Sequence, residues 1–103
     1  MKAVFLQFTD HEGKVTKTYT ACSLKTGMID NLFEIAEKAQ GLKTTENVRE
    51  IMSFFKDLKA IIVEVFGKQF TYDELNKNVE QDELMKVFNE LCSRISGELQ
   101  QKN

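Results

Sequence analysis

Proline and tryptophan are absent from this chain of 103 residues, while histidine occurs once and cysteine twice. Metal sites and nucleophilic catalysis need clustered His, Cys or carboxylate side chains at suitable spacing. The single histidine, His11, lies in a polar turn-like segment, and Cys22 and Cys92 are far apart in the sequence with no ligand motif around either. We therefore predict no catalytic, metal-binding or cofactor-binding residues, and a protein that is not an enzyme.

Long apolar runs are also missing, and neither sign of charge dominates. No stretch approaches the ~20 apolar residues of a membrane-spanning helix, and the apolar start of the chain is shorter than a secretory signal requires. With 14 basic and 16 acidic side chains the formal net charge is −2, which gives no long-range attraction to nucleic acid or anionic lipid. We expect a cytoplasmic protein with reduced thiols that binds neither nucleic acid nor membranes.

The hydrophobic pattern changes from a period of two residues near the start to a helical period after about residue 23. Val4, Leu6 and Phe8 alternate with other residues, and a polar stretch containing a glycine follows. Val15 and Tyr19 then fall on one face of a second expected strand. The pattern predicts an α+β, mainly α, single domain over residues 1–103, with a β-hairpin at 1–21, about four helices within 24–97, and a frayed tail at 98–103.

The second helix is expected over 45–66 and should be the longest and most central, because most of its circumference is apolar. Its start is assigned to Thr44 or Thr45 as a cap. Gly67 should close this helix in the left-handed conformation, as Gly41 should close the first helix. The main apolar face comprises Val48, Ile51, Met52, Phe55, Leu58, Ile62, Val65 and Phe66.

The third helix has two start signals. Thr71 and Glu74 have the spacing of a capping box, and Phe70 and Leu75 occupy the positions of a hydrophobic staple. These signals predict a short helix that ends near Asn78 and is followed by a last helix over about 80–97.

Two groups of residues are candidates for binding a partner. Phe54 and Ile61 form a second apolar face on the second helix, which is interpreted either as core or as an exposed contact face. The second group is acidic and belongs to the last two helices, where the carboxylates could be solvated or could attract a basic partner segment; its members are Asp73, Glu74, Asp82 and Glu83.

One passage carries a family resemblance. The sequence Val63-Glu-Val-Phe-Gly-Lys-Gln-Phe-Thr-Tyr-Asp-Glu-Leu75, followed by Asp82-Glu-Leu84, resembles the small tail assembly chaperones of long-tailed bacteriophages and prophages of Gram-positive hosts. The order of elements over residues 24–97 is similar as well. The resemblance implies a non-enzymatic protein of the bacterial host cytoplasm that binds the tape measure protein during tail assembly. It implies no catalytic residues and no cofactor.

Other interpretations stay open beside this one. A small phage or prophage interaction module, or a regulator acting on a host protein, is the first alternative, and a DNA-associated regulator is the second. Self-association of the chain is also open. The resemblance further implies a longer form made by ribosomal frameshifting, and Gln101-Lys102-Asn103 is compatible with the codons of a slippery heptamer.

Overall fold

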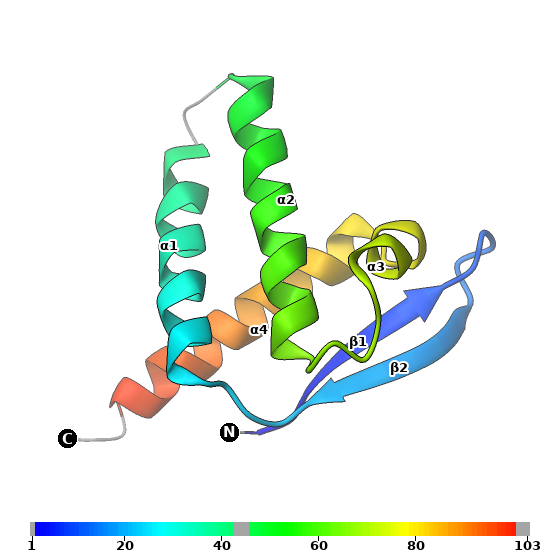
Figure 1. Cartoon of the computed structure of the whole chain (residues 1–103), viewed down its shortest axis with the longest axis horizontal. Coiled ribbons are helices and arrows are strands. Elements are labelled where there is room, and N and C mark those ends of the chain that lie inside the picture. Colours follow the sequence, from blue (N-terminus) through cyan, green and yellow to red (C-terminus); the bar gives the residue numbers. More distant parts are fainter. Residues whose placement is uncertain (1, 43–45, 101–103) are drawn as a thin grey trace.

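An antiparallel hairpin opens the chain and four helices follow it in one compact domain (Figure 1). The structure is a computed structural model that describes residues 2–42 and 46–100. The expected α+β, mainly α, fold is confirmed. Its elements are β1 (Val4–Thr9), β2 (Val15–Ala21), α1 (Thr26–Leu42), α2 (Val48–Val65), α3 (Tyr72–Asn78) and α4 (Gln81–Gln100).

The hairpin has one buried face, as the alternation in β1 predicts. Val4, Leu6 and Phe8 are all buried. Phe8 pairs with Lys17 but Thr9 pairs with Val15, so the register shifts and one residue of β2 bulges out. A bulge reverses the side-chain alternation beyond it. Val15 is accordingly 51% exposed, whereas Tyr19, which was predicted to lie on the same face of the strand, is partly buried against the core.

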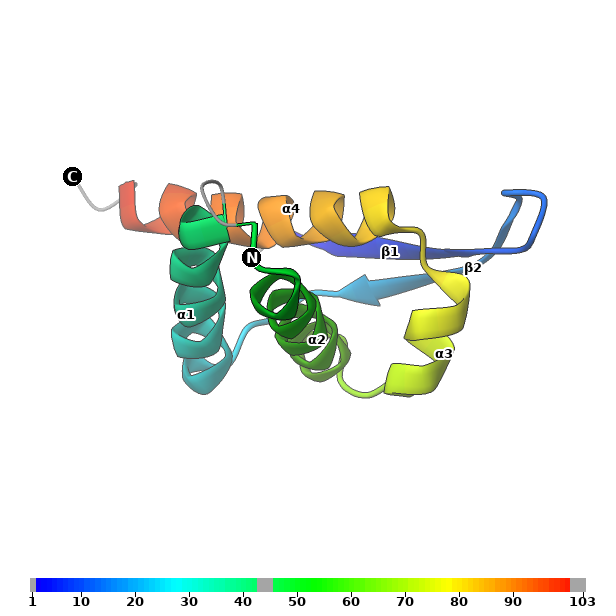
Figure 2. The same cartoon turned by 90° about the horizontal axis from the view of Figure 1, so that it is seen from above.

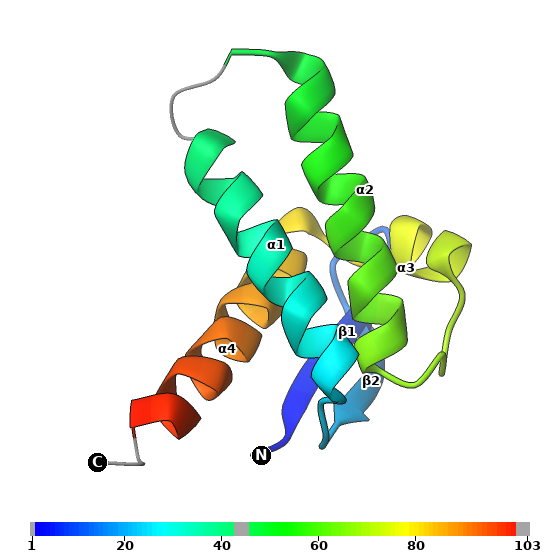
Figure 3. The same ribbon diagram turned by 60° about the vertical axis from the view of Figure 1, so that its left-hand side comes forward.

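The hairpin and α4 lie next to each other in one layer, and the other three helices cover one side of that layer. Figure 2 shows α4 running alongside β1, with α1, α2 and α3 on the same side of this layer. Figure 3 shows α1 and α2 side by side and antiparallel, with their far ends projecting beyond the rest of the molecule. The core lies between the hairpin and the helices as a single apolar cluster.

The first helix does not end where its glycine was expected to end it. Gly41 lies inside α1 and does not have positive φ, and the helix continues to Leu42. Leu42 is partly buried against the core. One more helical residue therefore buries an apolar side chain, which favours continuing the helix past Gly41.

The second helix begins with a different cap from the one predicted, and only part of its predicted apolar face is buried. Asn47 is its N-cap, and the Asn47 side chain accepts hydrogen bonds from the backbone N–H groups of Arg49 and Glu50. Thr44 and Thr45 lie outside the described residues. Val48 and Met52, expected in the core, are 65% and 66% exposed because this end of α2 projects. The buried face consists of Phe54, Leu58, Ile61, Ile62 and Val65.

The end of α2 follows the prediction. Gly67 has a φ of 68°, its N–H donates to the carbonyl of Glu64, and the N–H of Lys68 donates to the carbonyl of Val63. This pair of hydrogen bonds is the Schellman motif, which needs a residue in the left-handed region. A glycine adopts that region without a steric penalty.

The start of α3 also follows the prediction. Thr71 Oγ1 accepts the backbone N–H of Glu74 at 3.1 Å, and Glu74 Oε1 accepts the backbone N–H of Thr71 at 3.0 Å. Both halves of the capping box are therefore present. Phe70 and Leu75, in the staple positions, are both buried.

The last helix is longer than predicted. With 20 residues, α4 exceeds the 18 of α2, so the prediction that α2 is the longest helix is wrong. Its helical backbone continues through residues 98–100 of the expected frayed tail, and residues 101–103 lie outside the described part of the chain. Glu98, Leu99 and Gln100 are good helix formers, and no proline stops them.

Candidate partner-binding surfaces

The two apolar candidates of α2 lie in the core. Phe54 and Ile61 are only 3% and 5% exposed. The ring of Phe54 makes edge contacts with Phe55 at 5.1 Å and with Phe88 of α4 at 6.1 Å between ring centroids. Both residues are therefore part of the core, although the small exposed part of Ile61 also lines a hollow between α1 and α2.

The two acidic candidates of α3 have partners within their own helix. Glu74 completes the capping box with Thr71. Asp73 forms an exposed ion pair with Lys77, one turn later, at 3.1 Å. Carboxylates in the first turn of a helix also interact favourably with the helix dipole. Both residues thus have a local role in stabilising α3.

The two acidic candidates of α4 differ from each other. Glu83 Oε2 accepts the backbone N–H of Gln7 in β1 at 3.0 Å, and the Glu83 side chain is only 14% exposed. Asp82, next to it, is exposed and has no hydrogen bond or ion pair within the described residues. Of the four acidic candidates, Asp82 is therefore the one whose carboxylate is most available to a partner.

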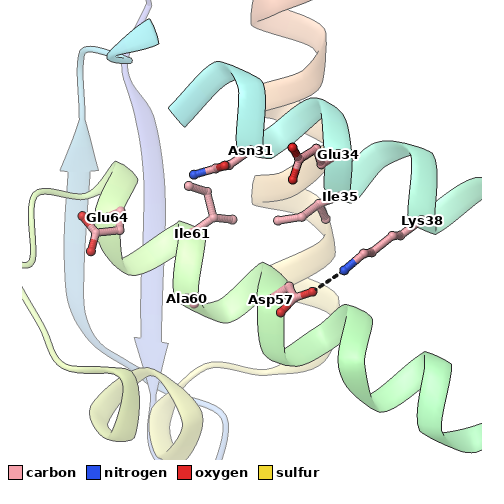
Figure 4. Close-up of a pocket in the computed structure, with 8 residues that line it drawn as sticks. All are labelled: Asn31, Glu34, Ile35, Lys38, Asp57, Ala60, Ile61 and Glu64. Carbon is pink, nitrogen blue, oxygen red and sulfur yellow. Dashed lines mark hydrogen bonds and ion pairs between the residues drawn. The ribbon is translucent and has the colours of Figure 1, made fainter. Parts of the chain in front are cut away.

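The structure also forms a groove, and Ile61 is the one residue of its lining that the sequence analysis had named as a candidate. It runs between α1 and α2 and holds a hollow of about 370 Å³ (Figure 4). Its wall residues are Asn31, Glu34, Ile35, Lys38, Asp57, Ala60, Ile61 and Glu64. A second hollow shares Asn31, Glu34, Ile61 and Glu64 and adds Lys25, Gly27, Met28 and Asp30. We call the two together the α1–α2 groove.

The rim of the α1–α2 groove carries more acidic than basic groups. Four carboxylates line it, from Asp30, Glu34, Asp57 and Glu64, against the two ammonium groups of Lys25 and Lys38. Figure 4 shows the ion pair that crosses the groove at one end, where Lys38 Nζ lies 2.6 Å from Asp57 Oδ2.

The remaining carboxylates lie at the other end of the α1–α2 groove. Glu64 lies 3.7 Å from Lys68 in an exposed pair. Asp30 and Glu34 have no ion pair or hydrogen-bonded side-chain partner in the described part of the chain. Lys25 also lines this end, so its three carboxylates lie near the two ammonium groups of Lys25 and Lys68, and a small excess of negative charge remains.

A sequence signal for the groove does exist. Asp30, Glu34 and Lys38 repeat every four residues on α1, and Asp57, Ala60 and Glu64 follow a helical spacing on α2. Each series forms a stripe along its helix. Recognising the groove requires knowing that the two stripes face each other, which depends on how α1 packs against α2.

A further exposed surface belongs to the projecting end of α2. Val48 and Met52 lie one turn apart, and both are largely exposed. Beside them is a hollow of about 420 Å³ at the junction of α1 and α2, lined by Lys38, Gly41, Leu42, Arg49, Glu50 and Ser53. The charges around this hollow are mixed in sign.

The described residues provide little for catalysis. Within residues 2–42 and 46–100, no group of three or more His, Cys, Asp and Glu side chains is placed to hold a metal ion. Cys22 is exposed, whereas burial raises the pKa of the Cys92 thiol and keeps it protonated. No helix in this part of the chain is long and apolar enough to cross a membrane.

Comparison with known proteins gives one match. The model of a family described as phage tail chaperone protein matches residues 1–103, which is the whole chain. No curated protein and no solved structure matches.

Proposed function

Because this chain belongs to the phage tail chaperone family, we propose that it binds the tape measure protein of its phage and keeps that protein soluble during tail assembly. Members of the family are assembly chaperones of phage tails and not enzymes, so the prediction of a non-enzymatic protein is confirmed. The match over residues 1–103 is the observation that carries the proposal. The tape measure protein as the specific partner comes from the resemblance of residues 63–75 and 82–84.

The physical basis of the proposal is coverage of exposed apolar helices. A tape measure protein is long and helical, and its apolar stripes are exposed before a tail tube surrounds it. Such stripes promote aggregation unless another surface covers them. A small helical domain can do so by receiving a helix in a groove. The α1–α2 groove and the exposed side chains of Val48 and Met52 support this type of contact.

The proposal includes the place of action. Tails are assembled in the cytoplasm of the infected bacterium, and we infer that the chaperone acts there, in a phage or prophage of a Gram-positive host. The partner is a protein, and the proposal involves no cofactor, nucleic acid or membrane.

Co-expression tests the proposed function. The tape measure gene of the same phage is expressed with this gene, or with a copy carrying an early stop codon, and the soluble fraction of the tape measure protein is measured. We expect tape measure protein in the soluble fraction, co-purifying with the tagged chaperone, only when the intact gene is present. Equal solubility in both cultures, or no co-purification, would overturn the proposal.

A further inference from the structure

We propose that the α1–α2 groove is the docking site for a basic amphipathic helix of the tape measure protein, an inference that rests on the proposed function. The occupant would have an apolar stripe facing the groove and Lys or Arg residues along both sides of that stripe. The juxtaposition of two acidic helix stripes over an apolar floor carries this inference.

The shape of the groove fits a helix. Ile35 of α1 and Ile61 of α2 form its apolar floor, and Figure 4 shows their side chains between the two helices. Ala60 is exposed on the α2 side, where a larger side chain would fill the space. The two hollows share four lining residues, and together their linings extend over more than one turn of each helix. A third helix could therefore lie along α1 and α2.

The charge of the groove selects the chemistry of the occupant. Asp30 and Glu34 lie on the α1 rim and Glu64 lies on the α2 rim, so carboxylates line both sides of the floor. A helix with cations flanking its apolar stripe would place a positive charge opposite each rim, whereas acidic flanks would be repelled. The Lys38–Asp57 ion pair crosses the groove, so the occupant lies on the Glu34 and Glu64 side of it.

The charges around the exposed side chains of Val48 and Met52 do not favour a partner of either charge. Arg49 and Glu50 flank the adjacent hollow with opposite charges. Asp82 and Glu90 line a shallower hollow together with Met85 and Lys86, and all of its lining residues come from the single helix α4. The α1–α2 groove differs from both because two helices form it and carboxylates lie on each side of it, Asp30 and Glu34 on α1 and Glu64 on α2.

The test compares matched charge changes on two surfaces. Glu34→Gln with Glu64→Gln removes two negative charges at the groove, and Asp82→Asn with Glu90→Gln removes two from α4. Tape measure protein retained by each tagged variant is measured after co-expression, over a series of salt concentrations. We expect the groove pair to lower retention about fivefold at low salt, as loss of two exposed charge pairs would, and the α4 pair to leave it within about twofold.

A second pair of variants tests the apolar floor. Ala60→Arg should lower retention at least about tenfold, because the new side chain fills the groove and adds a like charge for the occupant. Ser93→Arg adds the same side chain at an exposed position of α4 and should leave retention unchanged. Thermal unfolding of the purified variants identifies any that do not fold, and the groove charge pair tests the site without adding bulk.

The outcomes separate the two proposals. If wild type retains no tape measure protein, the proposed function fails. If wild type retains it and the groove variants retain it equally, the function stands and the groove assignment is overturned. Loss in the α4 variants alone, or equal loss in all variants, would also overturn the groove. A change in the oligomeric mass of the free protein caused by the groove variants would indicate a second copy as the occupant and would overturn it as well.

Discussion

At the scale of single residues, exposure separates side chains that look alike in the sequence. Phe66 and Met52 both belong to the broad apolar face expected for the second helix, yet Phe66 is 1% exposed and Met52 is 66% exposed. The ring of Phe66 also packs against that of Phe70, with 5.8 Å between centroids. Equal hydrophobicity therefore does not mean an equal contribution to the stability of the domain.

We expect Phe66→Ala to lower the free energy of unfolding by about 3–5 kcal/mol, because it removes a buried aromatic side chain and leaves a cavity. Met52→Ala is the matched control in the same apolar stripe and should change this free energy by less than about 0.5 kcal/mol. Urea unfolding followed by circular dichroism measures both. Similar losses in the two variants would contradict the burial of this face.

The capping box at α3 is a second feature of single residues. Thr71→Ala removes the side-chain acceptor for the backbone N–H of Glu74, and we expect a loss of about 1 kcal/mol. Thr71→Ser keeps the hydroxyl and should retain most of the stability. Denaturant unfolding gives the free energies, and hydrogen exchange at the Glu74 amide reports on the hydrogen bond itself. Unchanged stability and exchange in Thr71→Ala would remove the capping box as a stabilising device.

At the scale of the elements, local sequence signals predicted where helices begin and end better than they predicted which face of a helix is buried. The Thr71 capping box and the Gly67 helix end depend on a few neighbouring residues with special backbone or hydrogen-bonding properties, so the sequence alone was enough. The Gly41 prediction failed because burial of Leu42 favoured one more helical residue. The predicted apolar face of α2 is buried at Leu58, Ile62 and Val65 but exposed at Val48 and Met52, for a related reason. Apolar residues surround most of this helix, and only the packing of α1, α3 and α4 determines which of them are covered.

The candidate sites show the same division. The sequence identified the four carboxylates of α3 and α4, but the structure gives Asp73, Glu74 and Glu83 partners within the domain. The α1–α2 groove was missed because its two walls are separated by about one helix length of sequence. The distance between two helices follows from packing and not from a local sequence pattern. The sequence therefore shows the polar stripe on each helix but not that the two stripes face each other.

A two-stranded sheet has two free edges, and among the described residues a side chain from outside the sheet forms a hydrogen bond with the backbone of each edge. Glu83 of α4 accepts the outward N–H of Gln7 in β1. On the other edge, Gln69 Nε2 donates to the carbonyl of Thr20 in β2 at 2.9 Å. These contacts satisfy backbone groups that a third strand would otherwise pair with. They also connect β1 to α4 and β2 to the segment between α2 and α3.

The contact on the β1 edge leads to a prediction. Glu83→Ala leaves a partly buried backbone N–H without its acceptor, and we expect the free energy of unfolding to fall by about 1–3 kcal/mol. Asp82→Ala removes a neighbouring exposed carboxylate and should cost less than about 0.5 kcal/mol. Faster hydrogen exchange at the Gln7 amide in Glu83→Ala would place the effect at this edge. Equal stability in the two variants would show that the Gln7 contact contributes nothing.

At the scale of the whole molecule, the hairpin and the helices depend on each other. A hairpin of two strands is marginally stable alone in water. Here Phe8 of β1 and Tyr19 of β2 contact each other at 4.8 Å between ring centroids. Both also contact Phe70, at 5.3 Å and 4.8 Å, in the segment that joins α2 to α3. These rings are part of the single apolar core. In the part of the chain that the structure describes, the hairpin and the helices therefore share one core and should unfold together.

This dependence predicts one cooperative transition. Phe8→Ala should lower the free energy of unfolding by about 3–5 kcal/mol, and the loss should appear equally in the helical circular dichroism signal and in the near-ultraviolet signal of the aromatic side chains. Phe5→Ala, on the exposed face of the same strand, is the control and should leave both transitions in place. If Phe8→Ala shifted only the aromatic signal while the helices unfolded at the wild-type denaturant concentration, the hairpin would be a separate unit. The contacts of Phe8 and Tyr19 with Phe70 argue against that result, because removing one ring loosens the junction between α2 and α3 as well as the sheet.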